Sequence, residues 1–269
     1  MALAVVLVLV GLAAGVWYVL RGRTPTSAPP SASGRRQPLT EVPPWTFVAM
    51  VSQPTPAYAS PESATPTQTI APTWGGAPAA LPVVGQRKGW SEVRLVERPS
   101  GTSTAWLKSS SVTFSRTPYH VVVDLGSTRV VLFERSRVVL CAPAGVGTAD
   151  HPTPTGHFFV ALLAHPPSPA YGPFVLVTSA MANTVTDWQQ SGVPVITVAG
   201  PLGSGPAIGR TGARVTTGGV RLLDRDLERL RPLPAGTPVD IASAVSLAPT
   251  ARSTHCERPA PATTRPVGS

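Results

Sequence analysis

A stretch rich in glycine and threonine, residues 195–223, has the layout of a catalytic segment but few groups that could react. It reads VITVAGPLGSGPAIGRTGARVTTGGVRLL: a β-branched run ending in glycine, a glycine-rich loop, and a turn that leads toward a short helix. It contains no cysteine, histidine or carboxylate. The hydroxyls of Thr216 and Thr217 need a nearby base to act as nucleophiles, and no histidine occurs between His165 and His255. The segment is therefore an active site that has lost its reacting groups, or it never was one.

Groups elsewhere in the chain offer no ready substitute. Cys141 lies in the apolar run RVVLCAPAG and is predicted to be a small buried hydrophobic residue, whereas Cys256 lies in a polar tail. The two are far apart and form no CxxC pair, which excludes a zinc-finger type of metal site. A disulfide between them is possible outside the cytoplasm. Asp187 and Asp224 could act as bases only in an arrangement that the sequence does not suggest.

Two further patterns are weak signals for a metal or a cofactor. His151 and His157 flank a PTPTG loop, but a pair of histidines around a Pro-rich turn is a poor metal-ligand pattern, and surface positions are expected for both. Residues 200–209 are glycine-rich and follow no Walker or dinucleotide-binding spacing. We therefore expect no metal and no cofactor.

The N-terminus predicts membrane attachment. Residues 2–20 carry no charge and are long enough to cross a bilayer as a helix, so residues 1–23 are predicted to be an uncleaved anchor. Arg21 and Arg23 follow this segment, and by the positive-inside rule alone they would place the following chain in the cytoplasm. Residues 24–44, rich in Pro and Ser, are predicted to be an extended, solvated linker.

The charge balance is basic but diffuse. The formal net charge is +9, and almost all of the positive charge is arginine, since lysine occurs only at 88 and 108. Attraction to polyanions such as anionic cell-wall polymers is one interpretation, and a general compositional bias is the other. Because the arginines are scattered and form no basic stripe, no nucleic-acid partner is expected.

Two β-rich units are predicted between the linker and a disordered tail at 248–269. Residues 45–115 contain short strands broken by QRKG and RPSG turns. This pattern resembles bacterial SH3-like modules, with a Trp-x-x-Val-x-Leu strand followed by a second Trp strand, although Ala105 replaces the usual glycine. A β-rich spacer remains the alternative.

The second unit, residues 117–247, is predicted to be a β-sandwich. Its β-branched runs YHVVVDL, RVVLFE and RVVLCAPAG form a meander that should be buried on both faces, and a strand follows at 157–163. One short helix is expected at 224–232, capped by Asp224 and with Leu227 and Leu230 facing inward. A last strand at 236–242 closes a mostly β fold.

Three blocks of this second unit resemble the catalytic domain of L,D-transpeptidases, the YkuD-type domain. They are YHVVVDLGSTRVVLFERSRVVLCAPAGVG, HPTPTGHFFV and GARVTTGGVRLLDRDLERLRPLPAGTPVDI, in the order and spacing of that family. The preceding Trp-rich module suits actinobacterial members. The resemblance implies a domain that acts on peptidoglycan outside the membrane, where a cysteine thiolate forms a thioester with one stem peptide and an amine of another resolves it.

The resemblance also implies that the reacting side chains are missing. Gly219 stands at the position of the nucleophilic cysteine, and Thr217 and Ala199 stand at two histidine positions. Gly218, Arg221 and Leu222 are retained. The residues expected to line the remaining groove are Gly200, Thr216, Thr217, Gly218, Gly219 and Arg221.

These observations lead to one functional hypothesis and two alternatives. The hypothesis is a membrane-anchored, extracytoplasmic cell-wall protein without catalytic activity, which binds peptidoglycan stem peptides or anionic wall polymers, or regulates an active cell-wall enzyme. The first alternative is an active L,D-transpeptidase with a rearranged nucleophile. The second is a wall-binding protein that acts through the SH3-like module, with the second unit as scaffold.

Overall fold

The computed structural model describes residues 37–38, 42–96, 101–182 and 195–246. The chain divides into Met1–Gly34 and a compact unit, Arg35–Ser269, that holds every described residue. None of the helices within the described ranges is long and apolar enough to span a membrane. The predicted anchor (1–23) and most of the predicted tail (248–269) lie outside the described residues.

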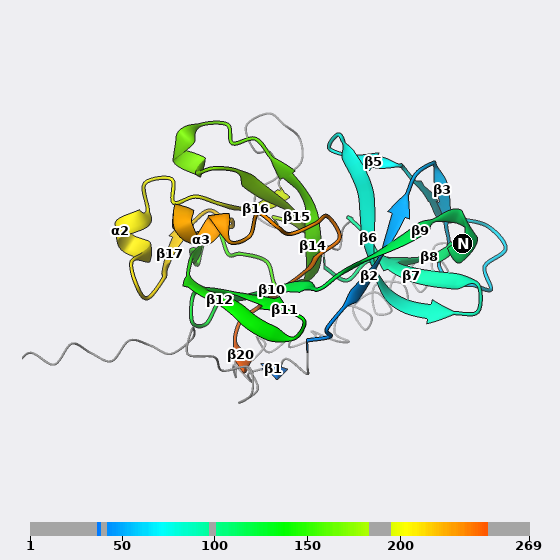
Figure 1. Cartoon of the computed structure of the whole chain (residues 1–269), viewed down its shortest axis with the longest axis horizontal. Coiled ribbons are helices and arrows are strands. Elements are labelled where there is room, and N and C mark those ends of the chain that lie inside the picture. Colours follow the sequence, from blue (N-terminus) through cyan, green and yellow to red (C-terminus); the bar gives the residue numbers. More distant parts are fainter. Residues whose placement is uncertain (1–36, 39–41, 97–100, 183–194, 247–269) are drawn as a thin grey trace, which may run out of the picture. The chain divides into compact units, whose positions relative to one another are not determined.

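The first β module contains a six-stranded sheet and a separate two-stranded one (Figure 1). Along the larger sheet the order is β8-β7-β6-β2-β9, with β5 paired to β6, while β3 and β4 pair with each other. A tight turn at Lys88 and Gly89 joins β6 to β7, and Gly89 has a φ of +76°, which a residue without a Cβ adopts freely. The strands are β2 (Thr46–Val51), β3 (Thr55–Ala57), β4 (Gln68–Ile70), β5 (Thr73–Trp74), β6 (Ala77–Arg87), β7 (Trp90–Arg94), β8 (Thr104–Lys108) and β9 (Thr113–Thr117).

The second β module is a ten-stranded sheet in the order β12-β11-β10-β19-β14-β15-β16-β18-β13-β17. The predicted meander is confirmed as the antiparallel strands β10, β11 and β12. The ten strands are β10 (Tyr119–Asp124), β11 (Arg129–Glu134), β12 (Arg137–Pro143), β13 (Gly145–Gly147), β14 (Gly156–Ala164), β15 (Val175–Met181), β16 (Val195–Ala199), β17 (Ala213–Thr216), β18 (Val220–Arg221) and β19 (Pro238–Ala242).

The two layers of the predicted sandwich are one continuous sheet that bends at β14. The first half of β14 pairs with β19 and the second half with β15, with a register shift after Val160. A strand that changes partners at an irregularity can turn a sheet over on itself. Accordingly, one hydrophobic core contains Leu140 from β12 and Val220 from β18, which lie far apart in the strand order.

Adjacent phenylalanines on β14 join the cores of the two modules. Successive side chains of a strand point to opposite faces. Phe158 packs in the core of the second module, and Phe159 packs with Ala49, Leu81 and Leu107 in the core of the first. Both phenylalanines are at most 2% exposed. Residues 158–161 are therefore buried on both faces because a different module covers each face, whereas His157 and Leu163 at the ends of the run are exposed.

The helical segments are short. They are α2 (Gly205–Ile208), α3 (Asp224–Glu228) and the 3₁₀ turns η1 (Ser109–Ser111) and η2 (Pro169–Tyr171). The prediction of a helix at 224–232 was too long, and Asp224 is the first helical residue rather than its cap, since extended Leu223 precedes it without a side-chain cap. Beyond Glu228 the backbone continues in i to i+3 hydrogen bonds. The inward orientation of Leu227 and Leu230 is confirmed, as both are fully buried.

The end of the predicted linker is part of the folded unit. Val42 is 7% exposed and packs with Val122 and Phe133 on the outer face of the meander. The short strand β1 (Gln37–Pro38) pairs in parallel with β20 (Val245–Ser246). The end of the predicted linker thus differs from the solvated chain expected from its composition, because residues 37–38 pair with β20 and Val42 covers an apolar surface of β10–β12.

Candidate functional site

Parallel pairing of β16 and β18 brings together the two halves of the glycine-rich segment. Ala199 lies opposite Arg221, and the N–H of Leu222 donates to the carbonyl of Ala199 at 2.9 Å. Val198 and Val220 both point into the main core. Because side chains alternate along a strand, Ala199, Arg221 and the position of Gly219 face the opposite, outer side.

Gly219 leaves an open position that the fold does not require to be glycine. A Cβ built there would lie 3.4 Å from the carbonyl oxygen of Thr197 and 3.9 Å from its Oγ1, which is ordinary contact. Its φ is also outside the left-handed region, in contrast to Gly218 with a φ of +107°. A side chain at 219 would therefore fit, so its absence has a chemical consequence without an evident structural cause.

The nearby threonine hydroxyls are not arranged as nucleophiles. The hydroxyl of Thr216 donates to the carbonyl of Gly219 at 2.6 Å and accepts from the N–H of Gly218 at 3.2 Å. Both bonds hold the turn between β17 and β18 in place. Thr217, one residue later, is exposed to solvent. Thr216 is therefore a structural residue of the site rather than a candidate for the lost thiol.

Arg221 places a buried cation on the outer face of the site. Its side chain lies 5.0 Å from the ring of Tyr171, and the residue is only 7% exposed. Burial lowers the pKa of Arg221, while Tyr171 partly offsets this effect. Its Nη1 has no hydrogen-bond partner among the described residues. A buried donor without a partner is costly, so this face suits an anionic or carbonyl group of a ligand.

Ala199 is enclosed by apolar side chains. It is fully buried in a cluster with Val175 and Val177 of β15. Trp74 from the first module and Tyr171 pack against this cluster. The position that the resemblance assigns to an upstream histidine therefore has little free volume.

The glycine-rich loop, residues 200–209, lies close to this face and contains the helical turn α2. Gly200 donates its N–H to the carbonyl of Tyr171 at 2.7 Å. A Cβ at Gly200 would lie 2.7 Å from the backbone of Gly172 and 2.8 Å from Oδ1 of Asp224. Only glycine allows this close approach of the two loops. Asp187, the other carboxylate considered, lies outside the described residues.

Comparison with known proteins identifies the second module. The family model of the L,D-transpeptidase catalytic domain, YkuD, matches residues 118–241. Residues 118–241 are a YkuD-type domain. No curated protein matches the chain.

Solved L,D-transpeptidases are remote relatives in structure. One from Mycobacterium tuberculosis H37Rv has 18% identity over 54% of this chain and 67% of its own, with a TM-score of 0.36. One from Mycobacterium smegmatis has 15% identity over 71% of this chain and 100% of its own, with a TM-score of 0.36. The catalytic domain from E. faecium has 17% identity over 46% of this chain and 96% of its own, with a TM-score of 0.34.

The histidines of the YkuD-type domain have roles that the sequence did not reveal. Asp240 on β19 accepts hydrogen bonds from His120 Nε2 at 2.8 Å and from His157 Nδ1 at 2.7 Å. These residues come from three neighbouring strands, so only the pairing of β10 and β14 with β19 brings them together. His151 is exposed and does not share this network. Within the described ranges no three His, Cys, Asp or Glu side chains are placed to hold a metal ion.

This network shifts two pKa values in opposite directions. Burial alone would raise the pKa of Asp240, but the hydrogen bonds from His120 and His157 hold it well below its usual range. The hydrogen bond to Asp240 raises the pKa of His157, against partial burial and the charge of Arg94. The His157–Asp240 pair therefore contributes fully to the stability of the folded state below the ordinary histidine pKa of about 6.5. This contribution is lost as His157 deprotonates at higher pH.

We expect the protein to lose a small part of its stability between pH 6 and pH 8 through His157. Because the His157 side chain is 66% exposed, the loss should stay below about 1 kcal/mol. Asp240 does not change the stability between pH 6 and pH 8. Because its pKa is lowered, its stabilising contribution is lost only below about pH 4. Urea unfolding of wild type and His157→Gln at both pH values measures the effect. If the free energy of unfolding changes by the same amount between pH 6 and pH 8 in both proteins, this expectation is contradicted.

Cys141 differs from its prediction. It is half-buried rather than fully buried, it packs on the outer face of the meander, and it is disulfide-bonded. Its side chain alternates away from the core because Leu140 and Ala142 face inward. Cys256, the partner considered from the sequence, lies outside the described residues.

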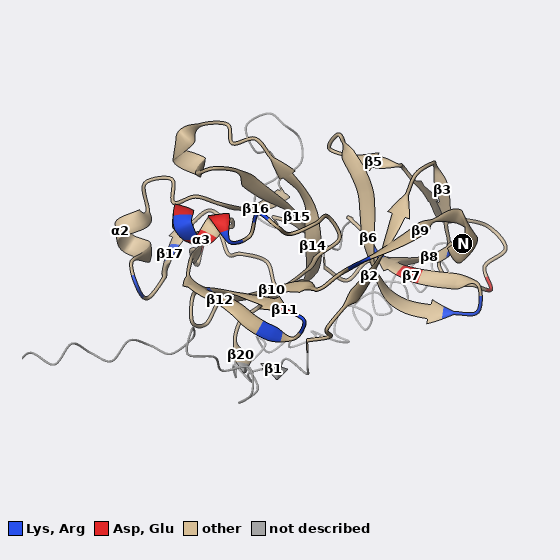
Figure 2. Cartoon of the chain, in the orientation of Figure 1, with Lys and Arg blue, Asp and Glu red and all other residues tan. Residues whose placement is uncertain are grey.

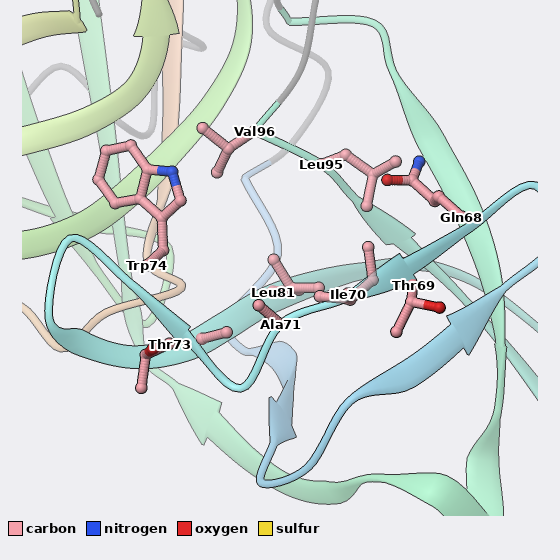
Figure 3. A pocket seen from close by; sticks show the side chains of 10 residues that line it. Gln68, Thr69, Ile70, Ala71, Thr73, Trp74, Leu81, Leu95 and Val96 are labelled. Carbon is pink, nitrogen blue, oxygen red and sulfur yellow. The ribbon is translucent and has the colours of Figure 1, made fainter.

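A hollow lies in the first module, beside the YkuD-type domain. It has a volume of about 160 Å³, and Figure 3 shows Trp74 at one end and Gln68 at the other. None of its ten described lining residues is charged, so it suits a neutral apolar group. Since Trp74 also packs against the cluster around Ala199, it connects this hollow with the site.

Proposed function

We propose that this protein is a membrane-anchored, extracytoplasmic cell-wall protein whose YkuD-type domain binds peptidoglycan stem peptides without joining them. Regulation of an active cross-linking enzyme is part of the same proposal. The family model that matches residues 118–241 is that of the L,D-transpeptidase catalytic domain, which supports a peptidoglycan ligand for this domain. Anionic wall polymers are a second class of ligand, favoured by the net charge of +9.

The observation that carries the proposal is the outer face of β16 and β18. It has an open position at Gly219, with no side chain to form a thioester, next to a buried guanidinium that keeps a free donor. Gly219 lies directly before β18, two residues from Arg221 and roughly 7 Å away along an extended chain. Such a surface can hold a carbonyl or carboxylate of a stem peptide, whereas acyl transfer needs a nucleophile.

Acyl transfer by a rearranged nucleophile is less well supported. Cys141 is disulfide-bonded and so has no thiolate to offer. The hydroxyl of Thr216 is used in two hydrogen bonds to the turn. His157, the histidine of the domain with a raised pKa, is hydrogen-bonded to Asp240 on β19 rather than to either group.

Extracytoplasmic placement rests on the disulfide of Cys141. Disulfides persist in oxidising compartments, and Cys141 takes part in one. The apolar segment 2–20 could hold the protein at the membrane, although Arg21 and Arg23 would favour the opposite orientation. A reporter fusion after residue 246 that is active in the cytoplasm would contradict this placement.

Binding to peptidoglycan sacculi tests the proposal. The full chain in detergent should bind in two ways: a charge-dependent part that fades between 0.1 M and 1 M salt, and a part that persists. The reason is that the screening length falls from about 10 Å to about 3 Å over this range, while shape and hydrogen bonds are affected little. Gly219→Trp should fill the open position and remove only the salt-resistant part.

Val84→Trp is the matched control, because it adds the same side chain to an exposed strand position of the first module. It should leave both parts of the binding unchanged. If all binding disappears at 1 M salt, or if folded Gly219→Trp binds like wild type, the groove is not a recognition site. The function would then lie in the first module or in a protein partner.

A further inference from the structure

Two phenylalanines at the edge of the first module are exposed without a structural reason. Phe47 on β2 is 52% exposed and Phe114 on β9 is 42% exposed. The antiparallel register places Phe47 opposite Arg116 and Phe114 opposite Ala49, so the two rings are diagonal neighbours on one face. Clustered apolar side chains at the surface mark interaction sites more often than single ones do.

Two arginines flank a tryptophan next to these rings. The guanidinium of Arg116 lies 4.5 Å from the Trp45 ring centre, and that of Arg135 lies 5.0 Å from it. Arg135 belongs to the tight β11–β12 turn, which carries basic residues in Figure 2. Neither arginine forms an ion pair with a carboxylate of the described residues. We call Trp45, Phe47, Phe114, Arg116 and Arg135 the Trp45 patch.

The chemistry of the Trp45 patch fits a lipid surface better than a soluble polyanion. A hydrophilic polymer of phosphates or carboxylates would pair with the arginines but would leave both phenyl rings in water. At the interface of an anionic bilayer, aromatic rings sit at the boundary between head groups and acyl chains, and arginines contact the phosphates. The patch combines both requirements within one surface.

The place of the patch in the chain also favours the membrane. Trp45 lies near the start of the folded unit, and the residues between the predicted anchor and Gln37 are 24–36. Thirteen residues reach at most about 45 Å. Tethering at this distance gives an effective concentration in the millimolar range, so a weak surface attraction is enough for docking.

We propose that the Trp45 patch docks the folded unit onto the anionic surface of the membrane that anchors the chain. The inference rests on the membrane attachment in the proposed function, but not on stem-peptide binding or on the loss of catalysis. Docking would hold β2 and β9 against the lipid head groups and set which faces of the unit are free to meet the wall.

Hydrogen–deuterium exchange of the full chain in nanodiscs tests the proposal. One set of nanodiscs contains phosphatidylcholine alone, and the other contains phosphatidylglycerol as well. Because β9 is the edge strand of its sheet, part of its backbone amides point away from β2 and can exchange. In anionic nanodiscs, exchange over residues 113–117 should slow at least about fivefold relative to neutral ones.

Two double variants make the test specific. Arg116→Glu/Arg135→Glu should abolish the difference between the two lipids. Lys88→Glu/Arg210→Glu makes the same change in net charge at exposed positions outside the patch and should preserve it. Phe47→Ser/Phe114→Ser should also weaken the protection from exchange. If the arginines alone attracted the membrane, removing the phenyl rings would leave the protection unchanged.

The outcomes separate this inference from the proposed function. A chain that does not remain with the nanodisc on gel filtration would overturn the membrane attachment itself. A chain that remains there but exchanges equally fast in both lipids would overturn the docking. Polyphosphate added to neutral nanodiscs gives a third outcome. If it slows exchange in β9, and does so equally in Phe47→Ser/Phe114→Ser, the patch binds a soluble polyanion and the docking proposal is overturned.

Discussion

Wild-type protein incubated with a carbapenem should keep its unmodified mass. Acylation requires a nucleophile that attacks the β-lactam carbonyl while the ring C–N bond opens, and the whole carbapenem mass then stays on the protein. Gly219 cannot attack, and Cys141 is disulfide-bonded. Intact-protein mass spectrometry checks this expectation. A stoichiometric adduct on any residue would contradict the non-catalytic proposal.

Rebuilding the site in steps should show which part of the chemistry is missing. Gly219→Cys should fold normally, because a Cβ there meets only ordinary contacts. Alone it should react slowly, since neither Thr217 nor Ala199, at the two histidine positions of the family, can deprotonate the thiol. Adding Thr217→His at an exposed position should raise the acylation rate by a factor of about 10² or more, the usual contribution of a positioned base.

The upstream histidine position should resist reconstruction. Ala199 is fully buried among Val175, Val177 and Trp74, so Ala199→His adds volume to a filled cluster. Overpacking of this kind typically costs about 1–3 kcal/mol. Adding Trp74→Ala should relieve the cost by opening space beside residue 199. If Ala199→His is as stable as wild type in urea unfolding, the apolar packing around Ala199 is looser than the structure indicates.

Phe159→Ala should destabilise the protein by about 3–5 kcal/mol, the usual cost of emptying a phenylalanine site in a core. Phe159 is 2% exposed and packs with the core of the first module although it belongs to the YkuD-type domain. The loss should therefore appear in both modules, as faster hydrogen exchange in β6 and β8 as well as in β14. Urea unfolding measures the total.

Phe47→Ala is the matched control, since its ring is 52% exposed and its loss should cost below about 0.5 kcal/mol. Phe158→Ala makes a second comparison, because that ring packs in the core of the YkuD-type domain instead. If Phe159→Ala leaves exchange in β6 and β8 unchanged, the first module is stable by itself and the shared core does not couple the two modules.

Most secondary structure of the YkuD-type domain could be predicted from the sequence. The runs YHVVVDL and RVVLFE are β-branched and lie between turn residues, so local propensity and periodicity agree. The helix at 224–232 was predicted too long because a run of compatible residues does not determine where α-helical hydrogen bonds change to i to i+3 bonds. The SH3-like character of the first module stays a prediction.

For the candidate site, too, some properties follow from the sequence and others only from the tertiary structure. The sequence by itself determined that no cysteine or histidine stands in the glycine-rich segment, because this is a matter of residue identity. The partners of each residue were decided only by tertiary structure. The His120–Asp240–His157 network joins three strands, and the Trp45 patch joins β2, β9 and the β11–β12 turn.

Burial and free space were also decided by the tertiary structure. The resemblance assigned both Ala199 and Gly219 to lost catalytic positions. In the structure, apolar side chains enclose Ala199, whereas Gly219 leaves room for a side chain. Phe158 and Phe159 look alike in the sequence and serve two different cores. The physical reason is that chain-distant strands and a neighbouring module supply these contacts, and no local pattern in the sequence encodes them.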